Sequence, residues 1–285
     1  MVKPGSKLEF CCPKCKGELV VDKQAAKCKN GHSYDESKYG YYNLFLTNVG
    51  GTHGDNKEMV LARRAFLGGE YYKPLLERLC ELVLRYTRPG GLLVDAGCGE
   101  GYYTNAIENA LFARDNHTRV AAFDISKDAV RQLVKKNHRI CAAVAGAYDM
   151  PVADGCVATV VNTFSPFAAD EIIRTLEDDG ILVMAIPESD HLYELKQILY
   201  KTPYKNVPKD PEIAGLRLEH DERVSFVMQL DGKENILSLF KMTPYAYRTP
   251  KECASRLESL NHLDCTADFR LFVYRKVTQA SSQSK

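Results

Sequence analysis

The sequence predicts an α/β fold: a doubly wound, mostly parallel Rossmann-like sheet preceded by a small metal-binding module. Three observations predict it. From residue 91 onward, short apolar runs alternate with helix-like segments, which is typical of a parallel sheet with helices on both faces. A glycine-rich turn follows the first apolar run, and a Cys/His cluster lies near the N-terminus. The 285 residues suit one medium-sized domain plus a small module.

The expected strands are short and apolar, and turn residues separate them from the helices. We expect strands at 91–94, 119–123, 142–145, 157–162, 180–186, 224–230 and 269–275, and helices at 102–111, 126 onward, 170–177, 192–200, 233–241 and 250–260. Apolar residues at helical spacing from Leu75 to Tyr86 predict an earlier helix with one buried face. The chain therefore divides into a module (1–48), a helical bridge (49–90) and a main domain (91–278).

The glycine-rich turn has the pattern D-x-G-x-G-x-G, formed by Asp95, Gly97, Gly99 and Gly101, with Glu100 inside it. It lies between a strand and a helix, so a ligand can approach bare backbone and free N–H groups at the helix N-terminus. A dinucleotide fingerprint places its third glycine one position later. The pattern resembles the first motif of the S-adenosylmethionine (AdoMet) methyltransferases, and a structural or nucleotide-binding turn is the alternative.

Asp124 ends the second expected strand, 23 residues after Gly101. In a Rossmann-like unit this position puts a carboxylate at the ribose hydroxyls. Nicotinamide enzymes share that acid, so the glycine spacing, rather than Asp124, favours AdoMet. An aspartate that only caps the next turn is the alternative. Ser126 is the expected cap of the following helix.

The Cys/His cluster consists of Cys12, Cys15, Cys28 and His32 in the spacing C-x2-C, twelve residues, C-x3-H. Two tight turns of this kind can close a tetrahedral site, and three thiolates with one imidazole suit zinc. Four protein ligands leave no position open for water, which predicts a structural ion. Cys11 is a competing ligand, but the spacing to Cys15 favours Cys12.

Composition narrows the class of protein further. No apolar run approaches the roughly 18 residues of a membrane span. Ten cysteines and no recognisable signal peptide predict a reducing, cytoplasmic location. Residues 1–48 contain eight lysines and five acidic residues, which fits a nucleic-acid footprint or a solvated lysine face equally well.

Taken together, the motifs resemble the bacterial 23S ribosomal RNA (guanine-N1)-methyltransferases, a family that includes tylosin-resistance enzymes. The matching segments run almost end to end: the Cys/His module, GYYNL (40–44), ARRAFL (62–67), DAGCGEGYYT (95–104), HLYELK (191–196) and MTPYA (242–246). The resemblance implies a zinc module that engages an RNA hairpin in domain II and a domain that methylates a guanine with AdoMet. It also implies a homodimer and adds Tyr72 and His191 to the cofactor site.

Two loops and one arginine pair complete the candidate site. Asp149, after the third strand, either borders the adenine of the cofactor or caps a turn. After the fourth strand, Asn162, Phe164 and Phe167 are candidates for orienting or stacking on an extruded base, with core packing as the alternative for the aromatics. Arg63 and Arg64 are expected to contact RNA, unless they pair with acidic residues.

The expected reaction is direct methyl transfer, in which the protein mainly orients the reactants. No residue identifies itself as the proton acceptor, and no cysteine is a clear nucleophile. Two rival functions remain: a small-molecule methyltransferase with an added zinc ribbon, and a non-catalytic zinc adaptor that binds RNA or protein. The sequence does not determine which hairpin guanine is modified or whether drug resistance results.

Overall fold

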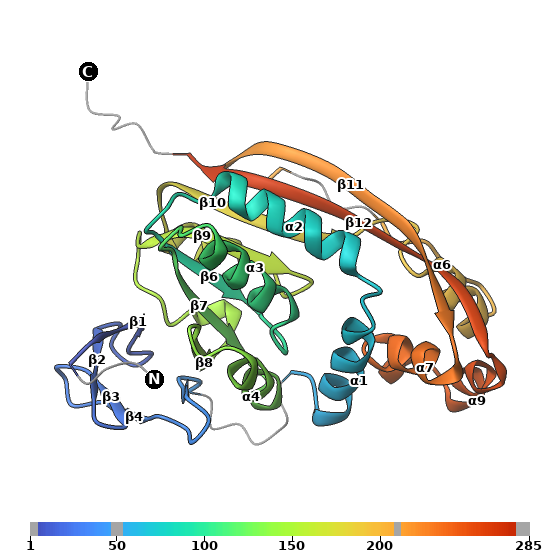
Figure 1. Ribbon diagram of the computed structural model, residues 1–285, viewed down its shortest axis with the longest axis horizontal. Helices are drawn as coiled ribbons and strands as arrows, with labels where there is room; N and C mark the ends of the chain where they lie inside the picture. The colour runs from blue at the N-terminus through green and yellow to red at the C-terminus, as the bar shows by residue number, and fades with distance from the viewer. Residues whose placement is uncertain (1–4, 47–53, 208–211, 278–285) are drawn as a thin grey trace.

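The computed structural model describes residues 5–46, 54–207 and 212–277. It is an elongated molecule with the N-terminal module at one end, a central sheet covered by helices, and a helical cluster at the other end (Figure 1). No helix among these residues has the length and apolar character needed to cross a bilayer.

The N-terminal module is a small antiparallel sheet of four strands in the order β1-β2-β3-β4. The strands are β1 (Lys7–Cys11), β2 (Glu18–Asp22), β3 (Ala25–Lys27) and β4 (Ser33–Asp35). Its apolar side chains, among them Leu8, Phe10 and Leu19, pack in one cluster with Met150 and Val152 of the main domain. The Cys11 N–H also donates to the Pro151 carbonyl (2.8 Å), so the module rests against the loop after β8.

The central sheet has eight strands in the order β11-β12-β10-β9-β6-β7-β8-β5. Its parallel part consists of β5 (Tyr41–Asn43), β6 (Leu92–Ala96), β7 (Arg119–Asp124), β8 (Cys141–Val144), β9 (Val157–Thr163) and β10 (Leu176–Pro187). Strand order reverses beside β6, so the carboxyl ends of β6, β7 and β9 form the switch-point crevice where ligands bind in such sheets. The predicted doubly wound fold is confirmed.

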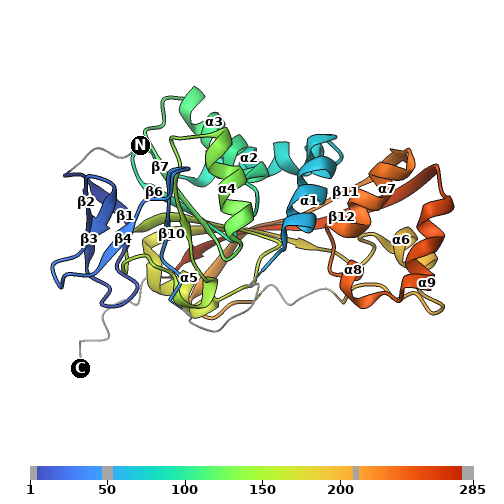
Figure 2. The same ribbon diagram turned by 90° about the horizontal axis from the view of Figure 1, so that it is seen from below.

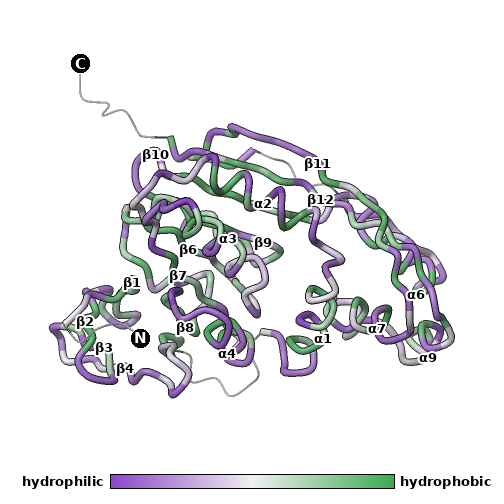
Figure 3. Tube along the Cα trace, in the orientation of Figure 1, coloured by the Kyte–Doolittle hydropathy of each residue, from purple (hydrophilic) through white to green (hydrophobic). Residues whose placement is uncertain are grey.

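The far edge of the sheet is antiparallel and much longer than the sequence suggested. β11 (Leu216–Asp231) pairs along its whole length with β12 (His262–Lys276), whereas β10 pairs only with residues 269–275 of β12. The pair therefore arches past the sheet towards the helical end (Figure 1). Much of the outer strand β11 is hydrophilic (Figure 3). The hydrophobic pattern of the sequence therefore predicted a strand only in its more apolar part, at 224–230.

The helices cover both faces of the parallel part (Figure 2). Helices α2 (Lys73–Tyr86), α3 (Tyr102–Ala113) and α4 (Lys127–Lys136) lie on one side and α5 (Ala169–Thr175) on the other. The helical end contains α1 (Lys57–Gly68), α6 (Tyr193–Leu199), α7 (Lys233–Lys241), α8 (Tyr245–Arg248) and α9 (Lys251–Ala254). The helix expected at 250–260 continues after α9 only as a 3-10 turn, Ser255–Ser259.

Candidate cofactor and metal sites

The four expected metal ligands converge in the module. The ligand atoms of Cys12, Cys15, Cys28 and His32 all lie within 4.8 Å of one another. His32 Nδ1 is 3.4 Å from the sulfurs of Cys12 and Cys28, and the sulfurs of Cys15 and Cys28 are 3.7 Å apart. A tetrahedral zinc with bonds of about 2.3 Å to sulfur and 2.0–2.1 Å to nitrogen separates its ligand atoms by about 3.6–3.8 Å. The donor set therefore fits zinc, while Cys11 lies outside it.

A second layer of contacts supports the metal ligands. The hydroxyl of Tyr34 lies 3.2 Å from Cys12 Sγ and can donate to it once the thiol is ionised. Cys28 and His32 face each other across a turn closed by the Cys28 N–H and the His32 carbonyl (3.1 Å). The module's own backbone thus presets the ligand geometry.

The glycine turn bends tightly at the carboxyl end of β6. Gly97, Gly99 and Gly101 all have positive φ, between 54° and 86°, a region that other residues rarely adopt. A Cβ atom on Gly97 would lie 2.3 Å from Ser165 Cβ, so this turn packs directly against the loop after β9. At Gly99, in contrast, the nearest atom to an added Cβ is an Arg63 nitrogen 3.8 Å away, so its backbone is open to a ligand.

Two buried carboxylates belong to this motif, Asp95 before the glycines and Glu100 between the last two. Each keeps one oxygen without a hydrogen-bond partner among the described residues. Asp95 accepts a hydrogen bond from Thr104 Oγ1 (2.6 Å) at its other oxygen, and burial raises the pKa of Asp95 to about 7. Glu100 pairs with Lys136 (2.6 Å) at its other oxygen. Unpaired buried oxygens of this kind suit a ligand that brings positive charge and hydrogen-bond donors, as AdoMet does.

Asp124, at the end of β7, is in direct contact with the glycine turn. Its carboxylate accepts the Gly99 N–H (2.9 Å) and the Ser126 N–H (2.8 Å), which fixes it at the end of β7. Burial raises its pKa, and these two backbone donors oppose that shift. Ser126 also caps α4 as expected, accepting the Ala129 N–H (3.3 Å).

Tyr72 and His191 come together at the same edge although 119 positions separate them. Their ring centroids are 6.2 Å apart, and both pack against Phe269 of β12, at 4.9 Å and 4.6 Å. Burial lowers the pKa of His191 to about 3, so the ring is neutral near pH 7. Its Nδ1 accepts the Asp268 N–H (3.3 Å), which puts the ring proton on Nε2 and makes His191 a donor rather than a base.

The three candidates for contact with a base, at the end of β9 and in the loop after it, have different surroundings. The Asn162 amide donates to Ser165 Oγ (2.7 Å) and the Pro166 carbonyl (3.3 Å), so it shapes the loop. Phe167 is half-buried and packs against the core on the α5 side. Phe164 is 40% exposed, has a φ of 58°, and lies near Tyr103 and Phe269 with centroid distances of 6.2 and 5.2 Å. With a strained backbone and an exposed ring, Phe164 is the best placed of the three to meet a base.

The remaining candidates have protein partners. Asp149 forms an ion pair with Lys16 of the module. Arg63 forms an ion pair with Asp55, whereas Arg64 is exposed and donates to Gln132 Oε1 (2.9 Å). The two arginines therefore face different surroundings, which their adjacency in the sequence did not reveal.

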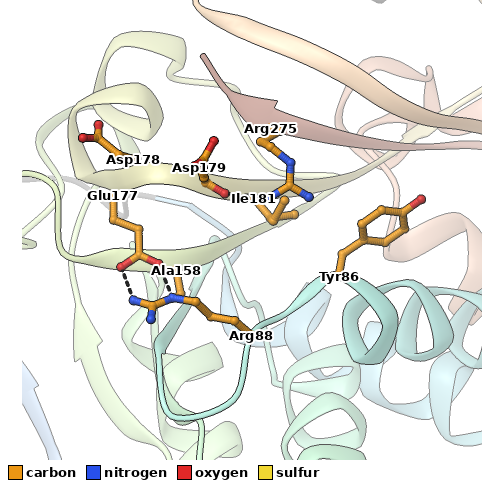
Figure 4. A pocket seen from close by; sticks show the side chains of 8 residues that line it. All are labelled: Tyr86, Arg88, Ala158, Glu177, Asp178, Asp179, Ile181 and Arg275. Carbon is orange, nitrogen blue, oxygen red and sulfur yellow. Dashed lines mark hydrogen bonds and ion pairs between the residues drawn. The ribbon is translucent and has the colours of Figure 1, made fainter. Parts of the chain in front are cut away.

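A hollow also exists at the opposite edge of the sheet, at the amino ends of β9 and β10 (Figure 4). Arg88 and Glu177 in its wall form an ion pair (2.5 Å), with Tyr86 and Arg275 nearby. Because ligands of doubly wound sheets bind at the carboxyl ends, this hollow is separate from the glycine turn and Asp124.

Comparison with known proteins agrees with this geometry. Residues 10–47 match the N-terminal zinc ribbon of RlmA, and residues 94–184 match a methyltransferase domain. The 23S rRNA (guanine(748)-N(1))-methyltransferase of Streptomyces fradiae is 31% identical over 87% of this chain and 90% of its own. The chain belongs to the 23S rRNA (guanine-N1)-methyltransferase family. Its cofactor is AdoMet, and its ribbon provides a structural zinc site.

Two further relatives of this chain are named as 23S rRNA (guanine-N1)-methyltransferases, without a numbered guanine. The protein of Micromonospora griseorubida is 33% identical over 93% of this chain and 97% of its own, and that of Bacillus subtilis 30% identical over 94% and 97%. Among solved structures, the YcgJ protein of Bacillus subtilis is 13% identical, covers 71% of this chain and 99% of its own, and has a TM-score of 0.50. That likeness shows the fold of the main domain.

The sequence did not reveal several residues that lie at the site but come from distant parts of the chain. Phe269 is buried and links Tyr72, His191 and Phe164, yet in the sequence it reads as one more apolar strand residue. Tyr103 lay within the quoted glycine motif, but only its contact with Phe164 reveals a role at the crevice. No sequence signal identified Asp55 as the partner of Arg63.

Proposed function

We propose that this enzyme methylates N1 of a guanine in a domain II hairpin of 23S rRNA, with the zinc ribbon holding the RNA. The observation that supports it most is the direct packing of the ribbon against the loop after β8, beside the crevice with the glycine turn. A small-molecule enzyme has no need of a basic ribbon at that position.

In this proposal the cofactor lies along the carboxyl ends of β6 and β7. The backbone of Gly97, Gly99 and Gly101 lets the cofactor approach closely. Asp124 accepts the ribose hydroxyls, and Asp95 and Glu100 each offer one unpaired buried oxygen. Tyr72 and neutral His191 contact it from the other side. We assign Asp149 to the contact with Lys16, with adenine meeting the backbone near Gly146. AdoMet supplies an activated methyl group when bound, so the chain's task is orientation and exclusion of water.

The target guanine must leave its stack before N1 is accessible. We propose that Phe164 stacks on the extruded base, since its ring is exposed at the crevice and braced by Tyr103 and Phe269. Asn162 holds the loop that presents Phe164. His191 donates through Nε2, so it does not accept the N1 proton.

A cluster of cations beside the ribbon fits the RNA backbone. Lys38, Arg131 and Lys135 surround the Tyr39 ring at 4.1 to 5.6 Å, and no carboxylate among the described residues forms an ion pair with any of them. Three unneutralised charges at one ring repel one another and favour an anionic partner such as phosphate. Arg64, exposed on α1, contacts Gln132 of α4, the helix that also carries Arg131 and Lys135.

The test compares the salt dependence of binding to a hairpin transcript. Lys38→Ala with Lys135→Ala should weaken binding and reduce the slope of log K against log salt by about 0.7–0.9 per lost phosphate contact. Lys27→Ala is the matched control, because this ribbon lysine is already paired with Asp22 (2.7 Å). An unchanged slope in the double variant would remove this surface from the RNA site.

The product test is primer extension on rRNA from cells with and without the gene. N1-methylguanine blocks the pairing edge, so extension should stop at a domain II hairpin guanine only when the gene is present. Read-through in both strains would overturn the substrate assignment. A homodimer and a cytoplasmic location belong to the same proposal, and light scattering of the purified enzyme with and without RNA tests the first.

A further inference from the structure

Arg63 lies at the cofactor crevice rather than on the outer surface of α1. One of its terminal nitrogens is the nearest atom to a Cβ placed on Gly99, at 3.8 Å. Its side chain is 29% exposed, whereas Arg64, one residue later, is exposed on the surface. The guanidinium thus faces the one glycine of the turn whose backbone is open to a ligand.

Two contacts hold the guanidinium in this place. One nitrogen forms an ion pair with Asp55, and the other donates to the Met242 carbonyl (3.1 Å) in the segment after α7. Asp55 is itself anchored, since its carbonyl accepts the Ser126 hydroxyl (2.7 Å) at the start of α4. Arg63 is therefore positioned from three elements, α1, α4 and α7, at a point where they meet the glycine turn.

The charge balance of the crevice makes this arginine significant. Asp95, Glu100, Asp124 and Asp55 are all acidic, and Lys136 is committed to Glu100. The positive charge of Arg63 acts on Asp124, Tyr72 and Tyr103, lowering the pKa of each against a larger effect of burial. Its guanidinium therefore lies among the residues assigned to the cofactor.

We infer that Arg63 binds the α-carboxylate of AdoMet, which replaces Asp55 as the carboxylate partner of the guanidinium. The inference rests on the proposed cofactor site. The α-carboxylate is the only anionic group of AdoMet, and a guanidinium fork matches a carboxylate with two parallel hydrogen bonds. Exchange of one carboxylate partner for another keeps the charge of Arg63 compensated in both states. Arg64, which lacks this environment, remains with the RNA surface.

The experiment measures, by calorimetry, the affinity of the full-length zinc-loaded protein for two ligands. S-adenosylhomocysteine (AdoHcy) has the α-carboxylate, while 5′-methylthioadenosine has the same adenine, ribose and thioether without the amino-acid part. Arg63→Ala should weaken AdoHcy binding about 10- to 100-fold and leave methylthioadenosine binding unchanged. Arg63→Lys, which keeps the charge but loses the fork, should give an intermediate loss. Arg64→Ala is the matched control and should change neither affinity.

Each other outcome overturns a different statement. Equal loss for both ligands, or no loss for either, in a variant that melts like the wild type would show that Arg63 only supports α1 or does nothing at the site. Failure of the wild-type protein to bind AdoHcy would overturn the cofactor site itself. Loss of RNA salt dependence in Arg63→Ala with unchanged AdoHcy affinity would return Arg63 to the RNA surface.

Discussion

The zinc ribbon and the cofactor crevice are assembled in opposite ways. All four ribbon ligands lie between residues 12 and 32, and two local turns bring their ligand atoms within 4.8 Å. The crevice joins Tyr72, Gly99, Asp124 and His191, which come from four segments spread over 120 positions. Local turns set the first site, whereas the strand order of the parallel sheet sets the second. The two sites should therefore fail independently.

The largest effect is expected from breaking the ribbon. Cys28→Ser removes one of three thiolates from a module that has little core of its own, so stoichiometric zinc should be lost and the ribbon should unfold locally. Affinity for AdoHcy should stay within about twofold of wild type, because the crevice has no residue from the metal site. Metal analysis and calorimetry on the same sample measure both. Cys11→Ser is the control and should keep its zinc; if it loses the metal instead, the ligand set is wrong.

Gly99→Val should break the crevice and spare the ribbon. A branched side chain at this open backbone position would fill the ligand's approach, so AdoHcy affinity should fall by more than about 100-fold. Gly155→Val is the matched control: Gly155 has a similar φ of 57°, has nothing within 4 Å of an added Cβ, and lies at the opposite edge of the sheet. Comparable loss of AdoHcy binding in both variants would attribute the effect to backbone strain.

Asp124→Asn should give a smaller loss, about 1.5–3 kcal/mol of binding free energy, because it removes the charge from hydrogen bonds to the ribose. The asparagine keeps one acceptor for the Gly99 or Ser126 N–H, so the turn should survive. Unlike Arg63→Ala, this change should weaken AdoHcy and methylthioadenosine equally, since both contain the ribose. Selective loss of AdoHcy alone would place Asp124 near the amino-acid part.

His191 should contribute a pH dependence to folding. Burial, with a further contribution from Lys196 that Asp268 opposes, lowers its pKa to about 3 in the folded state. The unfolded chain therefore binds a proton below about pH 6.5 that the folded chain does not, and stability falls as pH decreases towards 3, by about 1.4 kcal/mol per unit. Above pH 6.5 this contribution is constant. Urea unfolding at pH 5 and 6.5 should show a shallower decline for His191→Gln, and identical declines would contradict the assignment.

The sequence predicted the regular elements of the fold well wherever local signals exist. Ser126 caps α4 as its position indicated, and the helix expected at 233–241 matches α7 residue for residue. The antiparallel edge was less visible, because the middle of β11 is a run of polar and charged residues from Glu219 to Arg223 and the strand is far longer than its apolar part. The strand Tyr41–Asn43 was missed since only three residues pair with β8, at the end of the segment expected to belong to the ribbon.

The sequence alone determined the chemistry that depends on spacing: the zinc ligands, the glycine turn and the acid after the second strand. Their geometry comes from bonds and turns within a few residues, so a pattern of letters is enough. Only the tertiary structure showed that residues of the same type and close in the sequence lie in different surroundings. It placed Arg63 at Gly99 and Arg64 on the surface beside Gln132. It placed Phe164 at the crevice, Phe167 half-buried against the core, and Asp149 against Lys16. Those choices depend on which distant segments pack beside a side chain, and packing follows from the whole sheet.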